Sequence, residues 1–277
     1  MPRFMWTGLL VVILMSCQPE GEVPADIGLQ FYSLRNQFEK DVPGTLQLIK
    51  GWGIQSIEGG ETYGMELDEF MHLLAENDLK VHSIGADYKD LATSPEVVIG
   101  KAKLFGAKYV MCPWIPHEGD EFTLENTREA ISVFNKAGEI LAAQDLQLVY
   151  HPHGYEFRPY GGGTLMDLML EEADHFDFEM DVFWFTHGGA DPLAYLNKHP
   201  DKFKLLHLKD MEHGVEGNDS GHEDVETNVV LGTGQIDIAT IVGRARELGI
   251  EYMFIEDESS RVEEQLPQSL EFLKSLH

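Results

Sequence analysis

Short apolar runs alternate with longer amphipathic runs eight times between residue 27 and the end of the chain. Each short run has the length of a strand, and the longer runs carry apolar residues at helical spacing. A helix between two strands carries the chain back across the sheet, so that the strands pair in parallel. Eight such units over 27–277 predict a single α/β domain, a closed (β/α)8 or TIM barrel, which typically takes about 250 residues.

The expected element boundaries follow from the same pattern. Strands are predicted at residues 27–33, 54–58, 79–85, 108–113, 146–151, 176–181, 203–209 and 251–256. Helices are predicted at residues 43–52, 66–77, 95–105, 123–144, 164–173, 193–197, 236–248 and 263–276. An open doubly wound sheet is the alternative, although no Gly-x-Gly-x-x-Gly turn follows the first strand.

The charge balance excludes some partners. The chain has 48 acidic and 20 basic residues, a formal net charge of −28. Such a surface repels phosphate backbones and anionic headgroups, so we expect no nucleic-acid partner. The two cysteines, Cys17 and Cys112, cannot form a disulfide framework or a thiolate zinc cluster.

The first 17 residues have the pattern of an export signal. A basic start precedes the apolar run 4–15, which is shorter than the about 20 residues that span a bilayer. Residues 14–17 (LMSC) resemble a bacterial lipobox, in which the cysteine is lipidated. We therefore predict a lipoprotein signal peptide over 1–17 with lipidation at Cys17, a flexible acidic tether over 18–26, and attachment to the cell envelope through the lipid alone. A buried N-terminal helix is the alternative.

Four consecutive predicted strands, the fifth to the eighth, end in a metal-binding type of side chain: His151, Asp181, His207 and Glu256. The carboxyl ends of barrel strands meet at one rim, where the active site of such a fold lies. Imidazole and carboxylate ligands together suit Mn, Co, Zn or Fe better than Ca, and Mg is a further option. We expect one divalent ion at these residues. Separate solvated loop residues are the alternative.

Other residues near the strand ends are candidates for catalysis or substrate binding. His153 shares the face of His151, and Lys209 shares that of His207, because strand side chains alternate. We assign catalytic roles to Lys209, His153 and Glu256; Lys209 can bind a substrate oxygen, stabilise an enediolate, or act as a base if its pKa is depressed. The expected substrate-binding residues are Glu58, Tyr32, Trp114, Glu156, Arg158 and Trp184. Structural or solvated roles are the alternative for each.

The segment 211–232 is long and very polar for a connection in a barrel. Long loops on the catalytic face are often lids or specificity elements. His213 and His222 could hold a second ion there, but a flexible acidic loop is the favoured interpretation.

Several motifs together resemble the xylose isomerase-like barrel superfamily, often called sugar phosphate isomerases/epimerases. The similarity covers 27–277. Its most specific pieces are 28–35 (GLQFYSLR), 149–157 (VYHPHGYEF), 180–184 (MDVFW), 206–210 (LHLKD), 254–256 (FIE) and 232–237 (GTGQID).

The resemblance implies a metal set of Glu, Asp, His and Glu from the fifth to the eighth strand. Asp181, His207 and Glu256 match it, whereas His151 stands where the isomerases and epimerases carry Glu. In the epimerases, that Glu and the eighth-strand Glu act as opposed acid and base. An imidazole held by a metal is a poor replacement. The resemblance therefore implies metal-assisted proton abstraction beside a sugar carbonyl, but it disfavours epimerisation.

Some members of the superfamily are lyases that act on 3-keto-sugars and 3-keto-glycosides, and this branch fits His151 better. An exported location favours an unphosphorylated sugar or glycoside as the substrate. The alternatives are a ketose isomerase/epimerase, a non-catalytic lipid-anchored sugar-binding protein, and a metal-dependent hydrolase or endonuclease. The acidic charge disfavours the last of these for a DNA substrate. A homo-oligomer is compatible with all of them.

Overall fold

The computed structural model describes residues 22–276, and its main sheet closes into a ring of eight parallel strands. Around the ring the order is β1-β2-β3-β4-β5-β8-β9-β12. These strands are β1 (Ile27–Gln30), β2 (Ser56–Gly59), β3 (Lys80–Gly85), β4 (Tyr109–Cys112), β5 (Gln147–Tyr150), β8 (Asp177–Asp181), β9 (Phe203–Leu208) and β12 (Tyr252–Ile255). The predicted TIM barrel is confirmed. The signal peptide, Cys17 and most of the proposed tether lie outside the described residues.

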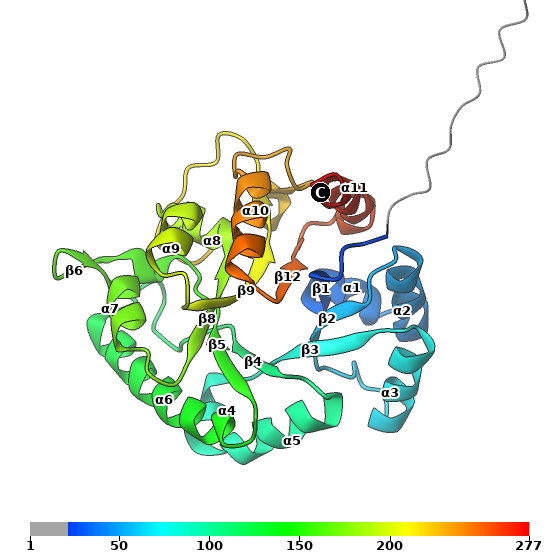
Figure 1. The fold of residues 1–277 in the computed structure, drawn as a ribbon, viewed down its shortest axis with the longest axis horizontal. Coiled ribbons are helices and arrows are strands. Elements are labelled where there is room, and N and C mark those ends of the chain that lie inside the picture. Colours follow the sequence, from blue (N-terminus) through cyan, green and yellow to red (C-terminus); the bar gives the residue numbers. More distant parts are fainter. Residues whose placement is uncertain (1–21, 277) are drawn as a thin grey trace, which may run out of the picture.

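Helices surround the strands, as Figure 1 shows. The eight predicted helices correspond to α2 (Val42–Gly51), α3 (Leu67–Glu76), α5 (Pro95–Phe105), α6 (Leu124–Ala142), α7 (Leu165–Glu172), α9 (Pro192–Lys198), α10 (Ile238–Leu248) and α11 (Val262–Lys274). Three shorter helices were not predicted: α1 (Arg35–Phe38), α4 (Tyr88–Thr93) and α8 (Val182–His187). Among residues 22–276, no helix combines the length and the apolarity that crossing a membrane requires.

Local capping explains where several helices begin and end. The Asp191 carboxylate accepts hydrogen bonds from the amides of Leu193 and Ala194, which makes it the N-cap of α9 as its place before Pro192 predicts. Helices α5 and α10 are followed by their C-cap residues Gly106 and Gly249, which adopt left-handed backbone conformations that glycine reaches without steric cost.

The largest departure from the predicted boundaries occurs after the first strand. The strand was expected to continue to residue 33, but it ends at Gln30 and passes into the 3-10 turn Phe31–Leu34 and then α1. The Gln30 side chain accepts a hydrogen bond from the amide of Tyr32 at 3.1 Å, which starts this turn. Tyr32 therefore lies in this turn and not in the strand, and it is 52% exposed at the rim of the barrel.

Two apolar layers hold the barrel together. Inside the ring, a small cluster of Tyr109, Met111, Val149, Leu205 and Phe254 fills the interior. A much larger buried cluster lies between the strands and the surrounding helices. The filled interior leaves the carboxyl-terminal rim as the place for a site.

Segment 211–232 is more structured than a flexible acidic loop. Its ends form a hairpin of β10 (Asp210–Met211) and β11 (Asn228–Val229). The Glu223 carboxylate lies 2.8 Å from Nε2 of the buried His187, and Arg158 binds both the side chain and the carbonyl of Asp219. These contacts tie the loop to the rim of the barrel.

Candidate active site

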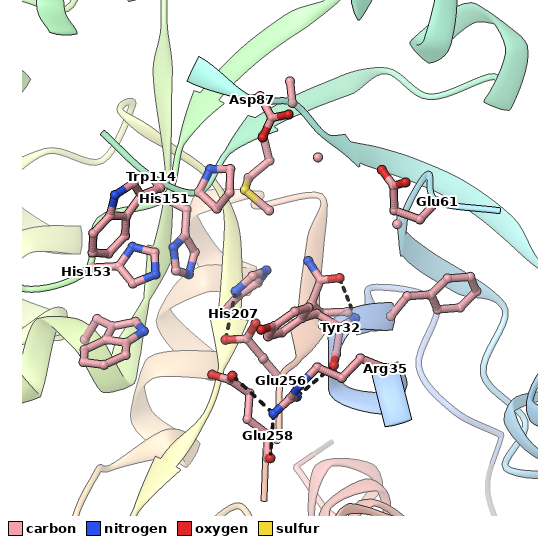
Figure 2. Close-up of a pocket in the computed structure, with 18 of the residues that line it drawn as sticks. Tyr32, Arg35, Glu61, Asp87, Trp114, His151, His153, His207, Glu256 and Glu258 are labelled. Atoms are coloured by element: carbon pink, nitrogen blue, oxygen red, sulfur yellow. Dashed lines mark hydrogen bonds and ion pairs between the residues drawn. The ribbon is translucent and has the colours of Figure 1, made fainter. Parts of the chain in front are cut away.

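A cavity of about 850 Å³ opens at the carboxyl ends of the strands. Its walls include residues that follow strands on both sides of the ring, together with part of the loop 212–227. Figure 2 shows His151, His153 and Trp114 on one side of this cavity and Glu61 on the other. A cleft of this size on the catalytic face is the default position for a substrate.

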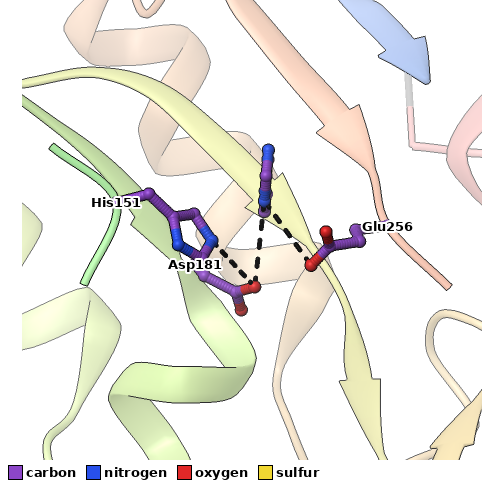
Figure 3. Close-up of side chains that lie close together, drawn as sticks. His151, Asp181 and Glu256 are labelled. Carbon is purple, nitrogen blue, oxygen red and sulfur yellow. Dashed lines mark hydrogen bonds and ion pairs between the residues drawn. The ribbon is translucent and has the colours of Figure 1, made fainter. Parts of the chain in front are cut away.

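Four buried side chains converge at the bottom of the cavity. His151, Asp181, His207 and Glu256 each offer a donor atom, and all four atoms lie within 4.8 Å of one another. Nε2 of His151 is 3.3 Å from Oδ2 of Asp181, and Nδ1 of His207 is 3.6 Å from Oε2 of Glu256 (Figure 3). The structure thus brings together the four residues that the strand ends predicted.

The Asp181 carboxylate has one oxygen available for this cluster. Its Oδ1 accepts hydrogen bonds from the amides of Phe183 and Trp184, at 2.7 and 3.2 Å, and so caps helix α8. Its Oδ2 faces His151 and His207. The short helix α8, which was not predicted, therefore fixes the orientation of a candidate ligand.

The His207 ring is oriented from below by Glu58. Nε2 of His207 lies 2.6 Å from Oε1 of Glu58, and its Nδ1 faces Asp181 and Glu256. Burial by itself lowers the pKa of His207, but the carboxylates of Glu179, Glu256 and Glu58 outweigh it and raise that pKa well above its ordinary value. A metal ion held at Nδ1 would leave the ring proton on Nε2, toward Glu58. Nδ1 of both His151 and His207 is buried without a hydrogen-bond partner. Two imidazoles, two carboxylates and a carboxylate behind one imidazole fit a divalent metal ion.

The position of Glu58 corrects the substrate-binding role expected for it. Its side chain is fully buried, it also accepts a hydrogen bond from Nε2 of Gln30 at 2.6 Å, and it is not among the residues lining the cavity. Glu179, two residues before Asp181 on the same face of β8, lies beside it. Burial, followed by the nearby Glu58 carboxylate, raises the pKa of Glu179 well above its ordinary value. Sequence analysis missed Glu179, although strand alternation places it on the inward face.

The surroundings of Lys209 rule out one of its expected roles. Its Nζ lies 3.2 Å from Oε2 of Glu256 and 2.5 Å from Oε1 of Glu258. Burial by itself lowers the pKa of Lys209, but the carboxylates of Glu256, Glu258 and Asp181 outweigh it and raise that pKa. These contacts favour the ammonium form of Lys209 over the neutral amine that a base requires. Glu258, which lines the cavity, was not predicted.

Aromatic rings form the wall above the metal cluster. The His153 ring lies between Trp114 and Trp184, with centroid distances of 5.2 and 5.4 Å. Burial, and then the neighbouring His151, lower the pKa of His153 well below its ordinary value, so the imidazole is neutral at pH 7. All three rings line the cavity, as does Tyr32. Tyr32, Trp114 and Trp184, expected to bind substrate, and His153, expected to be catalytic, therefore all line the cavity.

Glu156 and Arg158 do not reach the cavity. Glu156 is fully buried and accepts hydrogen bonds from the Tyr150 hydroxyl and the His153 amide. Arg158 donates to the carbonyls of Asp120 and Phe122 and binds Asp219. Glu156 therefore supports the turn that carries His153, and Arg158 joins two loops. Both are corrections, since substrate binding was expected of them.

Further lining residues were not among the predicted substrate contacts. Arg35 follows the unexpected 3-10 turn and lies 3.8 Å from Glu258, while His222 and Glu223 come from the loop 212–227. His222 lies 3.9 Å from Asp120, with ring contact to Trp114. Among the described residues, neither of the two groups with metal-binding geometry includes His213 or His222. Within residues 22–276, this loop therefore contributes to no group of side chains that could hold the second ion considered for it.

Comparisons with known proteins agree with this architecture. Residues 46–276 match the family model for the xylose isomerase-like TIM barrel. No curated protein matches significantly. Two Parabacteroides distasonis structures described as sugar phosphate isomerase/epimerase are similar, one with 24% identity over 89% of this chain and 96% of its own, at a TM-score of 0.74. The other has 22% identity over 94% and 96%, with a TM-score of 0.72.

A third similar structure is of a protein named IolI, described as having a zinc atom bound. It is 14% identical over 90% of this chain and 95% of its own, with a TM-score of 0.67. At these identities the structural matches establish the fold.

Proposed function

Because the chain belongs to the xylose isomerase-like TIM barrel family, we propose that it is a divalent-metal-dependent sugar enzyme that removes a proton beside a carbonyl. We further propose that it is a lyase acting on unphosphorylated 3-keto-sugars or 3-keto-glycosides. The observation that carries the proposal is the convergence of His151, Asp181, His207 and Glu256 within 4.8 Å at the bottom of a cavity. The chemistry that a divalent ion supplies at such a cluster is polarisation of the ketone oxygen.

The reaction requires one base and one proton for the leaving group. His153 lines the cavity above the cluster, and we assign it both tasks. It takes the proton from C2, next to the C3 ketone, and the electron pair moves onto the ketone oxygen. The C1–O bond then breaks, a C1–C2 double bond forms and the ketone is restored. The leaving oxygen takes the proton back from His153, so that the step is redox-neutral.

His151 favours elimination over epimerisation. Inversion at a carbon requires acid and base groups on opposite faces of the substrate, and His151 stands at the position of one of them. His151 is an imidazole that faces Asp181 at 3.3 Å within the metal cluster. It therefore supplies no carboxylate that could act as the opposed acid or base. Lys209 adds a fixed positive charge behind Glu256, which favours negative charge developing nearby.

Two features support an unphosphorylated substrate. The glycine-rich turn between β11 and α10 has amides that could bind an anion, but those of Gly232, Gly234 and Ile236 all donate to the Asp210 carboxylate. Among the described residues lining the cavity, Arg35 and Lys101 are both ion-paired, with Glu258 and Glu61. A phosphate in the cavity would therefore meet amides and cations that already have partners within the protein.

The proposed place of action is the cell envelope, with the chain anchored through lipid on Cys17. The apolar run that ends in residues 14–17 (LMSC) supports this assignment. Glycosides meet a cell at its envelope, which agrees with an unphosphorylated substrate.

The reaction is tested by incubating metal-loaded protein with 3-keto-glycosides and free ketoses in D₂O and following products by NMR. We expect loss of the leaving group and an alkene proton at C1 from the keto-glycosides, and no reaction after metal removal. Conversion of ketoses without elimination would establish an isomerase instead. Binding of sugars without any reaction would establish a sugar-binding protein.

A further inference from the structure

The cavity extends well beyond the metal cluster. The four candidate ligands lie in or directly after β5, β8, β9 and β12, which are consecutive around the ring. The cavity also reaches the ends of β1, β2 and β3 and the helices α4 and α5. In Figure 2, Glu61 lies on the opposite side of His207 from His153 and Trp114. We call this far part the second compartment, lined by Phe31, Tyr63, Gly85, Ala86, Val98 and Lys101.

The total volume exceeds what one sugar ring needs. Clefts of about 300–1,000 Å³ take drug-sized ligands. A cavity of about 850 Å³ is near the upper end of that range. A monosaccharide held at the metal cluster would not reach the second compartment, which would then contain only water.

The second compartment is open because β3 ends in a glycine. Gly85 shares the inward face of β3 with the fully buried Ser83, since strand side chains alternate. A Cβ built on Gly85 would meet no atom within 4 Å, and its backbone is not in the left-handed region. No conformational reason therefore requires glycine at this position, whereas a side chain here would project into open space.

The walls of the second compartment suit a ring with apolar faces and hydroxyl groups at its edge. Tyr63 and Val98 supply apolar surface. Asp87 and Asp90 supply carboxylates whose side chains make no hydrogen bond or ion pair within the described part of the chain, although Asp87 is the N-cap residue of α4. Unpaired carboxylates accept hydrogen bonds from hydroxyl groups and repel anions.

From this geometry we infer that the substrate is a two-ring glycoside whose neutral, hydroxylated leaving group occupies the second compartment. The inference rests on the proposed function, because the metal cluster determines which end of the substrate holds the ketone. It specifies that function further: the leaving group is itself a ring, such as a second sugar, and carries no negative charge.

The test compares two 3-keto-glucosides, one with a glucosyl leaving group and one with a methoxy leaving group. Wild type is expected to favour the glucosyl compound in kcat/KM by at least about tenfold. Gly85→Leu fills the second compartment and should lower that preference by at least about tenfold. Gly243→Leu is the matched control, because its Cβ also meets no atom within 4 Å but it lies on the outer helix α10. The control should keep the wild-type preference.

A binding measurement separates this inference from the proposed reaction. Calorimetry with cellobiose and methyl glucoside should show tighter binding of cellobiose to metal-loaded wild type, and loss of that difference in Gly85→Leu. If no keto-glycoside reacts but this difference in binding is observed, the proposed lyase function is wrong and the second compartment still binds a second ring. If elimination occurs and wild type and Gly85→Leu have the same preference for the glucosyl compound, the second compartment does not bind the leaving group and the lyase function is retained.

Discussion

Nε2 of His207 lies 2.6 Å from Oε1 of Glu58, although the two residues are 149 positions apart in the chain. Glu58 lies on β2 and His207 on β9, and these two strands are not neighbours in the barrel. The contact therefore orients a candidate metal ligand from a strand that does not pair with its own. It gives Glu58 a positioning role under the metal cluster.

Glu58→Gln is expected to weaken metal binding. The amide keeps the shape of the side chain but loses the charge that favours the Nε2–H tautomer of His207. Losing such a partner typically costs about 10- to 100-fold in metal affinity. Competition with a chelator measures the change. Glu251→Gln, a carboxylate before β12 at the opposite end of the barrel, is the control, and an equal loss in both variants would contradict the positioning role.

Metal binding should stabilise the protein through Asp181. A ligand at 100 times its Kd adds about 2.7 kcal/mol to the free energy of unfolding. For a domain of this size that raises Tm by roughly 5–10 °C. Asp181→Asn should remove most of the rise, while asparagine still caps α8. Thermal unfolding with and without metal tests this, and an unchanged rise in the variant would exclude Asp181 as a ligand.

His151→Glu should change the reaction. A carboxylate at this position restores the opposed pair that inversion requires, so elimination should decrease and solvent deuterium should enter unreacted substrate. NMR in D₂O follows both outcomes in one experiment. Elimination at the wild-type rate would show that position 151 does not select the reaction.

Lys209→Met should be strongly destabilising. The variant leaves the buried Glu256 carboxylate without this cation and removes the nearer of the two cations beside the partly buried Glu258, and breaking a buried ion pair costs about 3–5 kcal/mol. Lys50→Met is the surface control. Its ion pair with Asp78 is exposed, and such pairs contribute about 0–1 kcal/mol. Urea unfolding compares the two, and similar losses would mean that Lys209 is not held as a buried cation.

Glu156 makes stability fall as the pH rises. Burial raises the pKa of Glu156 to about 7, above its ordinary value near 4.5. Between these values the folded state binds more protons than the unfolded state, so the stabilisation is complete below about pH 4.5 and is lost as the pH rises through 7. The shift corresponds to about 3 kcal/mol.

Urea unfolding of metal-free wild type and Glu156→Gln at pH 5 and pH 8 measures this loss. Wild type should lose about 2.5 kcal/mol more than the variant between these two pH values, because pH 5 already lies above the unfolded pKa. Parallel losses would show that Glu156 is ionised in the folded protein throughout.

The barrel and its metal-binding strand ends could be predicted from the order of residues along the chain. The alternation of apolar and amphipathic runs is local, and parallel strands necessarily present their carboxyl ends at one rim. For that reason His151, Asp181, His207 and Glu256 could be predicted to converge before any contact was known.

The surroundings of these residues could not be predicted in the same way, because they depend on how distant parts of the chain pack together. Glu58 and Glu156 end or follow strands as a substrate ligand would, but closure of the barrel buries both of them. The ammonium form of Lys209 is favoured because closure places Glu256 and Glu258 beside it. The charge state and the reach of a side chain depend on neighbours that are distant in the chain and on the loss of water around them. A local sequence pattern therefore predicts neither the charge state nor the reach of a side chain.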